Sequence, residues 1–373
     1  MSRTLSSTPA ADGFWMPSEL APHAGCWMLW PERPDNWRRG ALPAQQAFAA
    51  VARAIVRFEP LTVGASAGQY SLARASLPPT VRVLEISSND AWMRDVGPSF
   101  LVDTHARTRG VQWRFNAWGG LYRDYARDAQ VAQKVLELAG CERYCAPLVT
   151  EGGAMHVDGQ GTALVTEQSL LDPRRNPGLD RARIERLLER YLGVSRVIWL
   201  EQGVVEDETA GHIDNLACFA RPGEVCLTWT DDVRDPQQRI CGAALERLLA
   251  ARDARGRRLR VHRIPSPGPL YLTRREARGI LPRPGIRALR PGRRLAASYI
   301  NFYAPNGALL LPLLDGRTDA AARRALQGVF PRRRIVGVPA REILLGGGNL
   351  HCITQQQPLA PARARPAARR GRR

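Results

Sequence analysis

The stretch "VSRVIWLEQGVVEDETAGHIDN", residues 194–215, joins an apolar run to a polar segment that contains glycines. A helix-like stretch at 181–192, opened by Asp180 and closed by Gly193, precedes it. A second apolar run, "TALVTE" (162–167), precedes that helix. Short apolar runs on either side of a helix are typical of strands, so the stretch completes a strand–helix–strand unit.

The same plan occurs about five times along the chain, although sequence identity between the units is negligible. Local signals mark several helix ends: Gly140 stops one helix, Asp235 and Pro236 begin another, and Thr318 caps a third. The sequence therefore predicts an α/β chain of repeated units. The remaining parts are "GCWMLW" (25–30), a helix near 43–57 and "PLTVGA" (60–65); "PSFLVD" (98–103), "VQWRF" (111–115) and a helix near 124–139; "EVCLTWT" (224–230), a helix near 236–250 and "RLRVHRI" (258–264); and "ALLLPLL" (308–314), a helix near 319–328 and "RRIVGV" (333–338).

A polar, glycine-bearing segment follows four of these units at an equivalent place. Such segments would converge on a central pocket if the units formed a ring, like blades around an axis. An ordinary α/β sheet with loops at its strand ends remains the alternative. The four segments are "NDAWMRDVGP" (89–98), "TEGGAMHVDGQG" (150–161), "EDETAGHIDN" (206–215) and "GGGNLHCITQQQ" (346–357).

The length of 373 residues allows one large domain or two ordinary ones. No run of 18 apolar residues exists, and "MSRTLSSTPAADGFWMP" (1–17) has no apolar core of a secretory signal. We therefore expect no membrane association and no export. Seven cysteines in such a chain predict free thiols in a reducing compartment, and so a cytoplasmic protein.

The formal net charge is +19, and Lys134 is the only lysine among 54 basic residues. Six of the arginines lie in "PARARPAARRGRR" (361–373), where proline and like charge predict a disordered tail. The other arginines are scattered without interleaved aromatics, and no zinc-finger or RNA-recognition signature occurs. We expect no specific nucleic-acid binding, although the tail could contact phosphates nonspecifically.

Two long segments contain no lysine or arginine at all. They cover 144–173 and 197–220, where the average density of basic residues would give about eight. Carboxylates such as Glu151, Glu208 and Asp214 occur there instead. Surface charges more than ~8 Å away are largely screened at physiological salt, so the global positive charge does not oppose a local acidic site. The pattern indicates a pocket for a small cation.

The polar segments carry groups suited to covalent chemistry on such a cation. Cys352 follows three glycines, which leave room for its thiol to approach another molecule. His212 and Asp214 are two residues apart, so an extended backbone places both on one face. Taken alone, this pair could orient a base, bind a metal or satisfy a polar core. Likewise, Trp92 could be a core residue and Glu151 could belong to a tight turn.

A guanidinium fits this combination of groups. It is planar and permanently charged, and carboxylates accept its paired N–H donors in a bidentate fashion. Two carboxylates can fix its plane and leave one face open to a thiolate. The bound cation in turn lowers the pKa of a nearby thiol, because opposite charge favours the ionised form.

Five stretches together resemble the agmatine deiminase family of guanidine-modifying enzymes, which is related to peptidylarginine deiminase. The resemblance runs from about Gly13 to Pro358 and implies the pentein fold, a five-bladed α/β propeller of repeated ββαβ units around a central active site. It implies a single catalytic domain over 13–358, between a flexible N-terminus at 1–12 and a disordered tail at 359–373. The stretches are "GFWMPSELAPHAGCWMLWPERPDNWR" (13–38), "NDAWMRDVGP" (89–98), "EGGAMHVDGQGTALVTEQSLLDPRRNP" (151–177), "DETAGHIDNLACF" (207–219) and "GGGNLHCITQQQP" (346–358).

The resemblance also implies roles for individual residues, with no metal and no organic cofactor. Cys352 would be the nucleophile and His212 the general acid and base, while Asp95 and Asp214 would hold the guanidinium. The remaining roles concern substrate binding: Trp92 would pack against the substrate, Glu151 would add a carboxylate, and Glu208 would bind the distal amine.

The expected reaction is the deimination of agmatine to N-carbamoylputrescine and ammonia through a covalent intermediate, a step in putrescine biosynthesis. Within the family, peptidylarginine or free arginine is the alternative substrate, and a homo-oligomer is left open. A metal-dependent hydrolase is an alternative from another class, with His212, Asp214, His156 and Cys352 as ligands, but no motif such as H-E-x-x-H supports it. The second alternative from another class is a protein that binds nucleic acid or a membrane surface.

Overall fold

The computed structural model describes residues 3–281 and 290–360. Five units share one order: a first strand, a second strand antiparallel to it, a helix, and a third strand parallel to the second. Three units are complete in this form. They are β5 (Ser99–Val102), β6 (Thr108–Arg114), α5 (Asp128–Leu138) and β7 (Glu142–Val149); β8 (Met155–Val157), β9 (Thr162–Thr166), α7 (Arg181–Leu192) and β10 (Arg196–Leu200); and β11 (Ala217–Arg221), β12 (Glu224–Trp229), α8 (Pro236–Ala250) and β13 (Arg260–Pro265).

The other two units are variations on the same plan. One has only an antiparallel bridge from Tyr303 to Leu310 in place of a first strand, followed by a parallel pair. The other takes its first strand, β18 (Gln355–Pro358), from the far end of the chain. Their elements are β16 (Ala308–Leu313), α10 (Asp319–Val329) and β17 (Arg334–Pro339), and β2 (His23–Leu29), α1 (Leu42–Ile55), β3 (Leu61–Ala65) and an added β4 (Arg82–Glu85).

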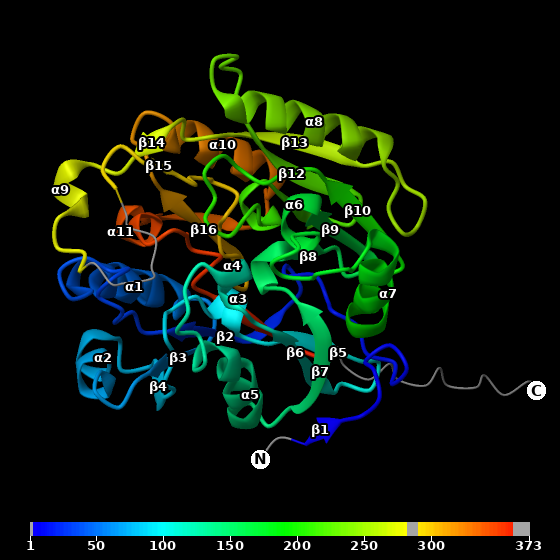
Figure 1. Ribbon diagram of the computed structural model, residues 1–373, viewed down its shortest axis with the longest axis horizontal. Helices are drawn as coiled ribbons and strands as arrows, with labels where there is room; N and C mark the ends of the chain where they lie inside the picture. Colours follow the sequence, from blue (N-terminus) through cyan, green and yellow to red (C-terminus); the bar gives the residue numbers. More distant parts are fainter. Residues whose placement is uncertain (1–2, 282–289, 361–373) are drawn as a thin grey trace, which may run out of the picture.

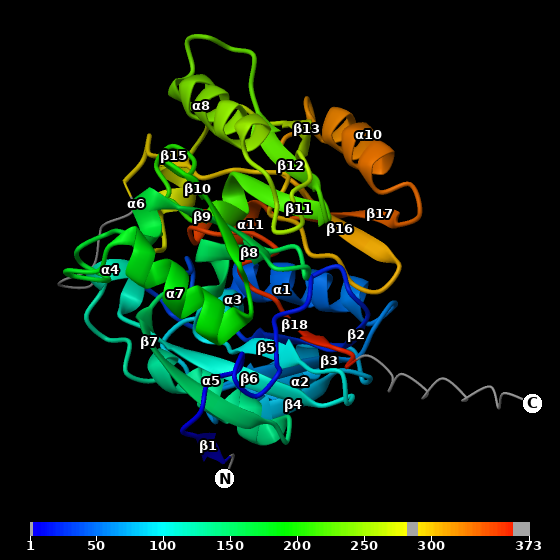
Figure 2. The same cartoon turned by 90° about the vertical axis from the view of Figure 1, so that its right-hand side faces the viewer.

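The pairing of β18 with β2 closes the ring. Gln355 lies opposite Trp27, and Trp27 Nε1 donates to Gln357 Oε1 at 3.0 Å. Figure 1 shows the chain passing once around the molecule from blue to orange, and Figure 2 shows the red β18 beside the blue β2. The prediction of five strand–helix–strand units in a ring is confirmed.

Local signals explain the helix ends that the sequence predicts well. The Asp180 side chain accepts the Arg183 N–H at the start of α7, and Gly193 ends it with φ of 70°. Asp235 caps α8 in the same way, accepting the Gln237 N–H. Because each signal lies within one turn of the helix end, the bounds follow from the sequence alone.

One helix cap and one helix start differ from the sequence prediction. Helix α10 begins at Asp319 as predicted, but Thr318 makes no side-chain cap to it, because its hydroxyl contacts the Tyr299 hydroxyl at 2.7 Å instead. Helix α5 begins at Asp128 rather than near residue 124, because Asn89 Oδ1 accepts the N–H groups of Arg127 and Asp128. A cap supplied from a distant segment leaves no local signal in the sequence.

The N-terminal residues that the structure describes, 3–12, contact the rest of the domain, while the flexibility expected of segment 1–12 stays a prediction. Strand β1 (Thr4–Leu5) pairs with β7, and the Ala10 N–H donates to the Arg190 carbonyl. Asp12 accepts from both Arg109 and Tyr144. The predicted disordered tail lies outside the described residues from position 361 onwards.

The remaining elements are short and connect the units. All seven cysteines are free thiols, as predicted. Among the described residues, no helix combines the length and apolar character needed to cross a membrane. The short elements are α2 (Tyr70–Ser76), α3 (Met93–Val96), α4 (Ala117–Gly120), α6 (Glu167–Leu170), α9 (Arg274–Ala277), α11 (Arg341–Leu345), β14 (Leu270–Tyr271), β15 (Arg294–Leu295) and two 3₁₀ turns at Gly152–Ala154 and Ile213–Asn215.

Five equivalent junctions precede the first strands of the units, and they meet in the interior. Helix α3 precedes β5, and the two 3₁₀ turns precede β8 and β11. Residues 298–301 precede the Tyr303 bridge, and residues 349–354 precede β18. Four of these junctions belong to the polar segments singled out in the sequence; the one at 298–301 does not.

Candidate active site

Asp95 from one junction and His212 and Asp214 from another converge on Gly153, which belongs to a third. A methyl group on Gly153 would lie 2.6 Å from His212 Nδ1 and 2.9 Å from both Asp95 Oδ1 and Asp214 Oδ2. The Gly153 N–H donates to Asp95 Oδ1 at 3.0 Å, and Trp118 Nε1 donates to Asp95 Oδ2 at 2.9 Å. The absence of a side chain at Gly153 therefore lets the three functional groups share one space.

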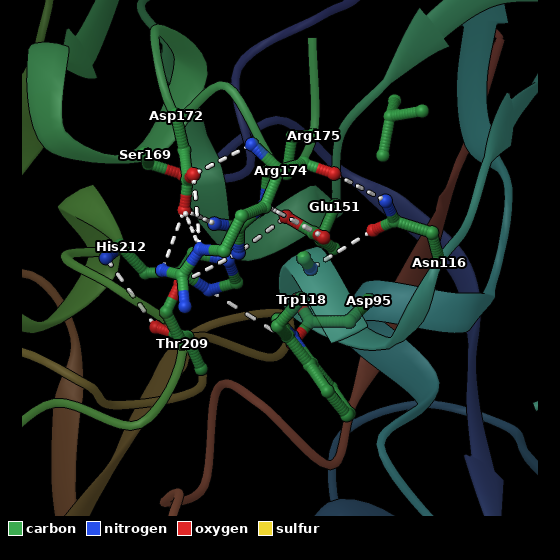
Figure 3. Close-up of polar contacts among 12 residues, drawn as sticks. Asp95, Asn116, Trp118, Glu151, Ser169, Asp172, Arg174, Arg175, Thr209 and His212 are labelled. Carbon is green, nitrogen blue, oxygen red and sulfur yellow. Dashed lines mark hydrogen bonds and ion pairs between the residues drawn. The ribbon is translucent and has the colours of Figure 1, made fainter. Parts of the chain in front are cut away.

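His212 is held between carboxylates on both ring nitrogens. Its Nε2 lies 3.1 Å from Glu151 Oε2, and its Nδ1 lies 3.9 Å from Asp95 Oδ2. Arg175 Nε in turn donates to both oxygens of Glu151 at 3.1 Å. Figure 3 shows Glu151 between His212 and Arg175. Glu151 is fully buried, so it contacts the imidazole and not the open space of the pocket.

The thiol of Cys352 lies beside one of these carboxylates. Its Sγ is 3.6 Å from Asp214 Oδ2 and 3.4 Å from Asn301 Oδ1. The Arg94 N–H donates to the Cys352 carbonyl at 3.0 Å, which ties the turn to α3. Arg94 itself pairs with Glu19 and not with its neighbour Asp95. The structure thus brings the predicted nucleophile to the predicted carboxylates.

Three consecutive glycines bring the backbone before Cys352 close to its neighbours. A methyl group on Gly346 would lie 2.3 Å from the Trp37 ring, and one on Gly348 would lie 2.5 Å from the Trp92 ring. Gly347 has φ of 107°, a conformation that residues with a side chain rarely adopt. Side chains at these positions would push the tryptophans away from the thiol.

One pocket opens onto this group of residues. It encloses about 610 Å³ of empty space including its open mouth, and Cys352, Asp95, Trp92 and Glu208 line it. His212 and Asp214 lie behind this wall, in contact with Asp95 and Cys352 respectively, and Glu151 lies behind His212. Further lining residues are Arg33, Asp35, Asn36, Asp90, Trp118, Leu121, Tyr122, Thr209 and Gly346 to Gly348. The pocket is therefore acidic and aromatic, as the sequence predicts.

The electrostatics favour a protonated imidazole. Burial alone would lower the pKa of His212, but the charges of Asp95, Glu151 and Asp214 overcome this and raise it to about 9. Burial raises the pKa of Asp95 to about 6, against the opposing charge of His212. Near neutral pH His212 therefore carries a proton that it can donate, while Asp95 is largely ionised.

The thiol of Cys352 is protonated without a bound cation. Burial, followed by the charges of Asp214 and Asp95, raises its pKa well above the ordinary value. A cation placed between the thiol and these carboxylates would cancel the repulsion that opposes ionisation. A positively charged ligand in this position would therefore favour the thiolate.

Several buried polar atoms at this point have no hydrogen-bond partner among the described residues. His212 Nδ1 and Asp214 Oδ1 are two of them, and Asn301 Nδ2 is a third. Buried polar atoms are normally paired, so atoms of this kind indicate where a ligand supplies the missing donor or acceptor. A guanidinium offers five N–H donors, and Asp214 Oδ1 is an acceptor of the kind that it needs.

Glu208 lies at the rim of the site, next to the glycines that precede the nucleophile. A methyl group on Gly347 would lie 3.1 Å from Glu208 Oε2. Glu208 also forms an ion pair with Arg293, which the sequence analysis did not anticipate. The negative charge at this end of the pocket is therefore smaller than the sequence predicts, although Asp35 and Asp90 line the same space.

The sequence analysis missed four residues that contact the site. Asn301 occupies the fifth junction and touches Cys352, but "SYINFY" (298–303) contains no charge or glycine to mark it. Trp118 reaches Asp95 from a helix with left-handed backbone, and Asp207 Oδ2 accepts the His212 N–H at 3.1 Å. His351 contacts Asp214 Oδ2 at 2.9 Å. Equivalence of the five junctions was the signal that could have found Asn301.

The metal-dependent alternative named His212, Asp214, His156 and Cys352 as ligands. Across 3–281 and 290–360, no group of three or more His, Cys, Asp or Glu side chains is arranged to hold a metal ion.

Gly153→Ala is expected to reduce kcat/KM by at least about 100-fold, because displacement of reacting groups by an ångström can cost that much. The added methyl group would lie within 3 Å of Asp95, His212 and Asp214. Steady-state kinetics with agmatine measures the effect. Gly242→Ala is the matched control, since nothing lies within 4 Å of a methyl group at that position of α8. Unchanged kcat/KM in Gly153→Ala would contradict the convergence described above.

Comparison with known proteins agrees with this geometry. The model of the Porphyromonas-type peptidyl-arginine deiminase family matches residues 15–358. This chain belongs to that family. A curated relative in the family, the agmatine deiminase of Stutzerimonas stutzeri strain A1501, is 55% identical over 361 residues, which cover 95% of this chain and 98% of the relative.

Solved structures of related deiminases superpose over almost the whole chain. The agmatine deiminase of Enterococcus faecalis has a TM-score of 0.93 and 44% identity, covering 98% of this chain and 100% of that one. A putative arginine deiminase from Porphyromonas gingivalis has a TM-score of 0.81 and 31% identity, covering 92% and 98%. The five units are therefore the blades of the pentein fold.

Proposed function

We propose that this protein is an agmatine deiminase, which hydrolyses agmatine to N-carbamoylputrescine and ammonia through a covalent amidino intermediate on Cys352. The observation that carries the proposal is the convergence of Cys352, His212, Asp95 and Asp214 at one acidic pocket. The full-length relatives named agmatine deiminase support the same substrate. The product belongs to putrescine biosynthesis.

In the proposed complex, Asp95 and Asp214 accept the N–H groups of the guanidinium. Asp214 Oδ1 is buried without a protein partner among the described residues, so it is available for this bond. Trp92 lines the pocket beside Cys352 and packs against the aliphatic chain. Its ring is fixed by the 3.0 Å hydrogen bond from Nε1 to Asp90 Oδ2 and by the Trp37 ring at 5.1 Å. The carbon of the guanidinium then faces the sulfur.

The first half of the reaction forms the covalent intermediate. Binding of the guanidinium favours ionisation of the Cys352 thiol, which releases its proton to solvent. The thiolate attacks the central carbon, and a C–S bond forms. Protonated His212 donates to the departing nitrogen, so the C–N bond breaks and ammonia leaves. The products of this half are an amidino group on sulfur and a neutral imidazole.

The second half returns the enzyme to its starting state. Neutral His212 takes a proton from a water molecule, whose oxygen attacks the same carbon. Collapse of the tetrahedral adduct breaks the C–S bond and expels the Cys352 thiolate. The carbon keeps the new oxygen, whose remaining proton passes to the Cys352 thiolate, and the urea group of N-carbamoylputrescine results. Glu151 stays bound to His212 in both halves and holds the imidazole in place.

The far end of agmatine is an ammonium, and we assign Glu208 to it. Glu208 lines the pocket on the side of the glycines, and it shares its carboxylate between Arg293 and the substrate. Asp35 and Asp90 add negative charge to the same pocket. Free arginine would bring a carboxylate towards these groups, so its binding is disfavoured by like charge.

The substrate assay tests the proposal most directly. We expect kcat/KM for agmatine to exceed that for free arginine by at least about 100-fold, because juxtaposed like charges cost several kcal/mol. Glu208→Gln is expected to raise KM for agmatine about tenfold, the equivalent of about 1.4 kcal/mol. Ammonia release measured with both substrates provides the comparison.

Glu201→Gln is the matched control for that assay, because Glu201 pairs with Arg247 outside the pocket. It is expected to leave both substrates unaffected. Equal use of arginine or of a peptidylarginine substrate would overturn the assignment of agmatine and leave the chemistry of Cys352 intact.

Cytoplasmic residence belongs to the same proposal and is supported by the seven free thiols, which persist in reducing compartments. The lack of specific nucleic-acid binding stays a prediction, and a homo-oligomer stays the open alternative to a monomer.

A further inference from the structure

His351, the residue before the nucleophile, connects two buried carboxylates. Its Nδ1 lies 2.9 Å from Asp214 Oδ2, and its Nε2 lies 2.8 Å from Glu19 Oε2. Glu19, His351 and Asp214 are 8%, 4% and 2% exposed. Neither Glu19 nor His351 has a part in the reaction described above. The three residues form a chain that ends at the group proposed to hold the guanidinium.

The geometry defines the charge of His351. An ionised carboxylate can only accept hydrogen bonds, so both ring nitrogens must donate and the ring is an imidazolium. Arg94 Nη1 lies 3.3 Å from Glu19 Oε1, on the far side of the same carboxylate. The cluster thus contains two anions, Glu19 and Asp214, and two cations, His351 and Arg94. Such a neutral, hydrogen-bonded arrangement is what a buried ionic group requires.

We propose that Glu19 and His351 are positioning residues that keep Asp214 ionised and aim its free oxygen at the guanidinium. This inference rests on the proposed deiminase function. Asp214 Oδ2 accepts from His351, which leaves Oδ1 as the oxygen without a partner among the described residues. His351 therefore fixes the orientation of the carboxylate, and its charge opposes protonation of Asp214. Glu19 acts one step further away, by keeping His351 charged.

The pKa shifts of Asp214 and His351 agree with these contacts. Burial would raise the pKa of Asp214, but the hydrogen bond and charge of His351 lower it. Burial and the charge of Arg94 lower the pKa of His351, whereas Glu19 and Asp214 outweigh them and raise it. The charged or titratable groups that face Asp214 and His351 from the packed elements are Glu19, Arg94, Asp95, His156, Asp207, His212, Cys218 and Cys352.

Loss of His351 therefore changes the pH at which agmatine binds. The pKa of Asp214 is depressed in the folded protein, so its carboxylate is present above that pKa and lost as pH falls through it. Without the imidazolium the pKa of Asp214 rises towards the physiological range. Binding of the guanidinium then weakens first on the acid side, where Asp214 takes up a proton, and recovers as pH increases.

The test measures agmatine binding in a Cys352→Ala background, so that no turnover interferes. Titration calorimetry at pH 6 and pH 8.5 gives two dissociation constants for each variant. Adding His351→Gln is expected to weaken binding at pH 6 by at least about 100-fold, since breaking a buried ion pair leaves an uncompensated charge. The loss at pH 8.5 is expected to be at least about tenfold smaller, because Asp214 is again ionised there.

His156→Gln is the matched control. His156 Nε2 lies 3.7 Å from Glu19 Oε2, but the Phe219 N–H donates to its Nδ1, so this ring is neutral. Burial lowers the pKa of His156 to about 4. Replacing it with glutamine removes a buried imidazole from the same cluster without removing a charge. For this variant in the Cys352→Ala background, the ratio of the dissociation constant for agmatine at pH 6 to that at pH 8.5 is expected to equal the ratio for Cys352→Ala alone.

Glu19 provides a second pair of variants in case His351→Gln does not fold. Glu19→Gln is expected to shift binding in the same direction by a smaller amount, and Glu19→Asp to restore it. A pH 6 to pH 8.5 ratio in His351→Gln and Glu19→Gln equal to that of the Cys352→Ala parent would overturn the positioning role. Failure of the Cys352→Ala parent itself to bind agmatine would instead count against the proposed function.

Discussion

Cys352→Ala is expected to form no N-carbamoylputrescine and still to bind agmatine. Alanine removes the atom that attacks the guanidinium carbon, while Asp95, Asp214 and Trp92 remain to hold the substrate. The loss of kcat should exceed about 10⁴-fold, as nucleophile removal does in enzymes with covalent intermediates. Ammonia release measures the loss of turnover, and titration calorimetry measures the retained binding of agmatine.

Cys352→Ser tests whether the acidity of the thiol, and not only the presence of a side chain, is needed for turnover. Serine restores a hydroxyl of similar shape, but its proton is held far more firmly than that of a thiol, so the variant should be almost as inactive as alanine. Cys26→Ala is a suitable control, because this buried thiol lies in β2 and burial raises its pKa beyond the useful range. Measurable turnover by Cys352→Ala would exclude the covalent mechanism.

His212→Gln is expected to reduce kcat by about 10² to 10⁴-fold, the usual contribution of a general acid and base. Wild-type activity needs the protonated imidazole, whose pKa is about 9, and the ionised form of Asp95, whose pKa is about 6. The pH profile of kcat/KM should therefore fall below about 6 and above about 9. The alkaline fall should disappear in His212→Gln, since no proton is left to lose there.

An agmatine analogue in which a terminal NH₂ of the guanidine is replaced by S-methyl separates the two tasks of His212. Methanethiolate leaves without prior protonation and the aminobutyl chain stays on the carbon, so His212→Gln should still form the covalent intermediate from this analogue but should hydrolyse it slowly. Mass spectrometry should then detect an adduct on Cys352 with the mass of agmatine less ammonia. His262→Gln removes a histidine that pairs with Glu224 outside the site and should behave as wild type. Fast hydrolysis of the adduct by His212→Gln would assign the base to another residue.

The sequence predicts best those features whose causes are local. Helices α7 and α8 begin and end where the sequence indicates, because Asp180, Gly193 and Asp235 act within one turn of their own helix ends. The start of α5 was placed too early, because its cap comes from Asn89 in a segment before β5. The attachment of residues 3–12 was missed for the same reason: β1 finds its partner, β7, more than a hundred residues away.

In the candidate site too, residues marked by a local sequence pattern were predicted, and residues whose partners are distant in sequence were not. Cys352, His212, Asp95 and Asp214 were found because each stands in a polar, glycine-bearing segment that recurs at the same place in a unit. Asp95, His212 and Asp214 meet at Gly153, and Cys352 Sγ lies 3.6 Å from Asp214 Oδ2, which agrees with the expectation that these segments converge. Asn301 was missed because its junction is apolar and aromatic, and Arg293 was missed because its partner Glu208 is distant in sequence.

The closure of the ring by β18 and β2 has a consequence for how activity arises during folding. The turn that carries the thiol leads directly into β18, and its partners come from junctions up to 257 positions earlier, as the Arg94–His351 contact shows. Contacts over such separations form late, because the intervening polypeptide must first lose much of its conformational freedom. Partly folded chains therefore have no activity, and during refolding the release of ammonia begins only when β18 has paired with β2 and all five units are assembled.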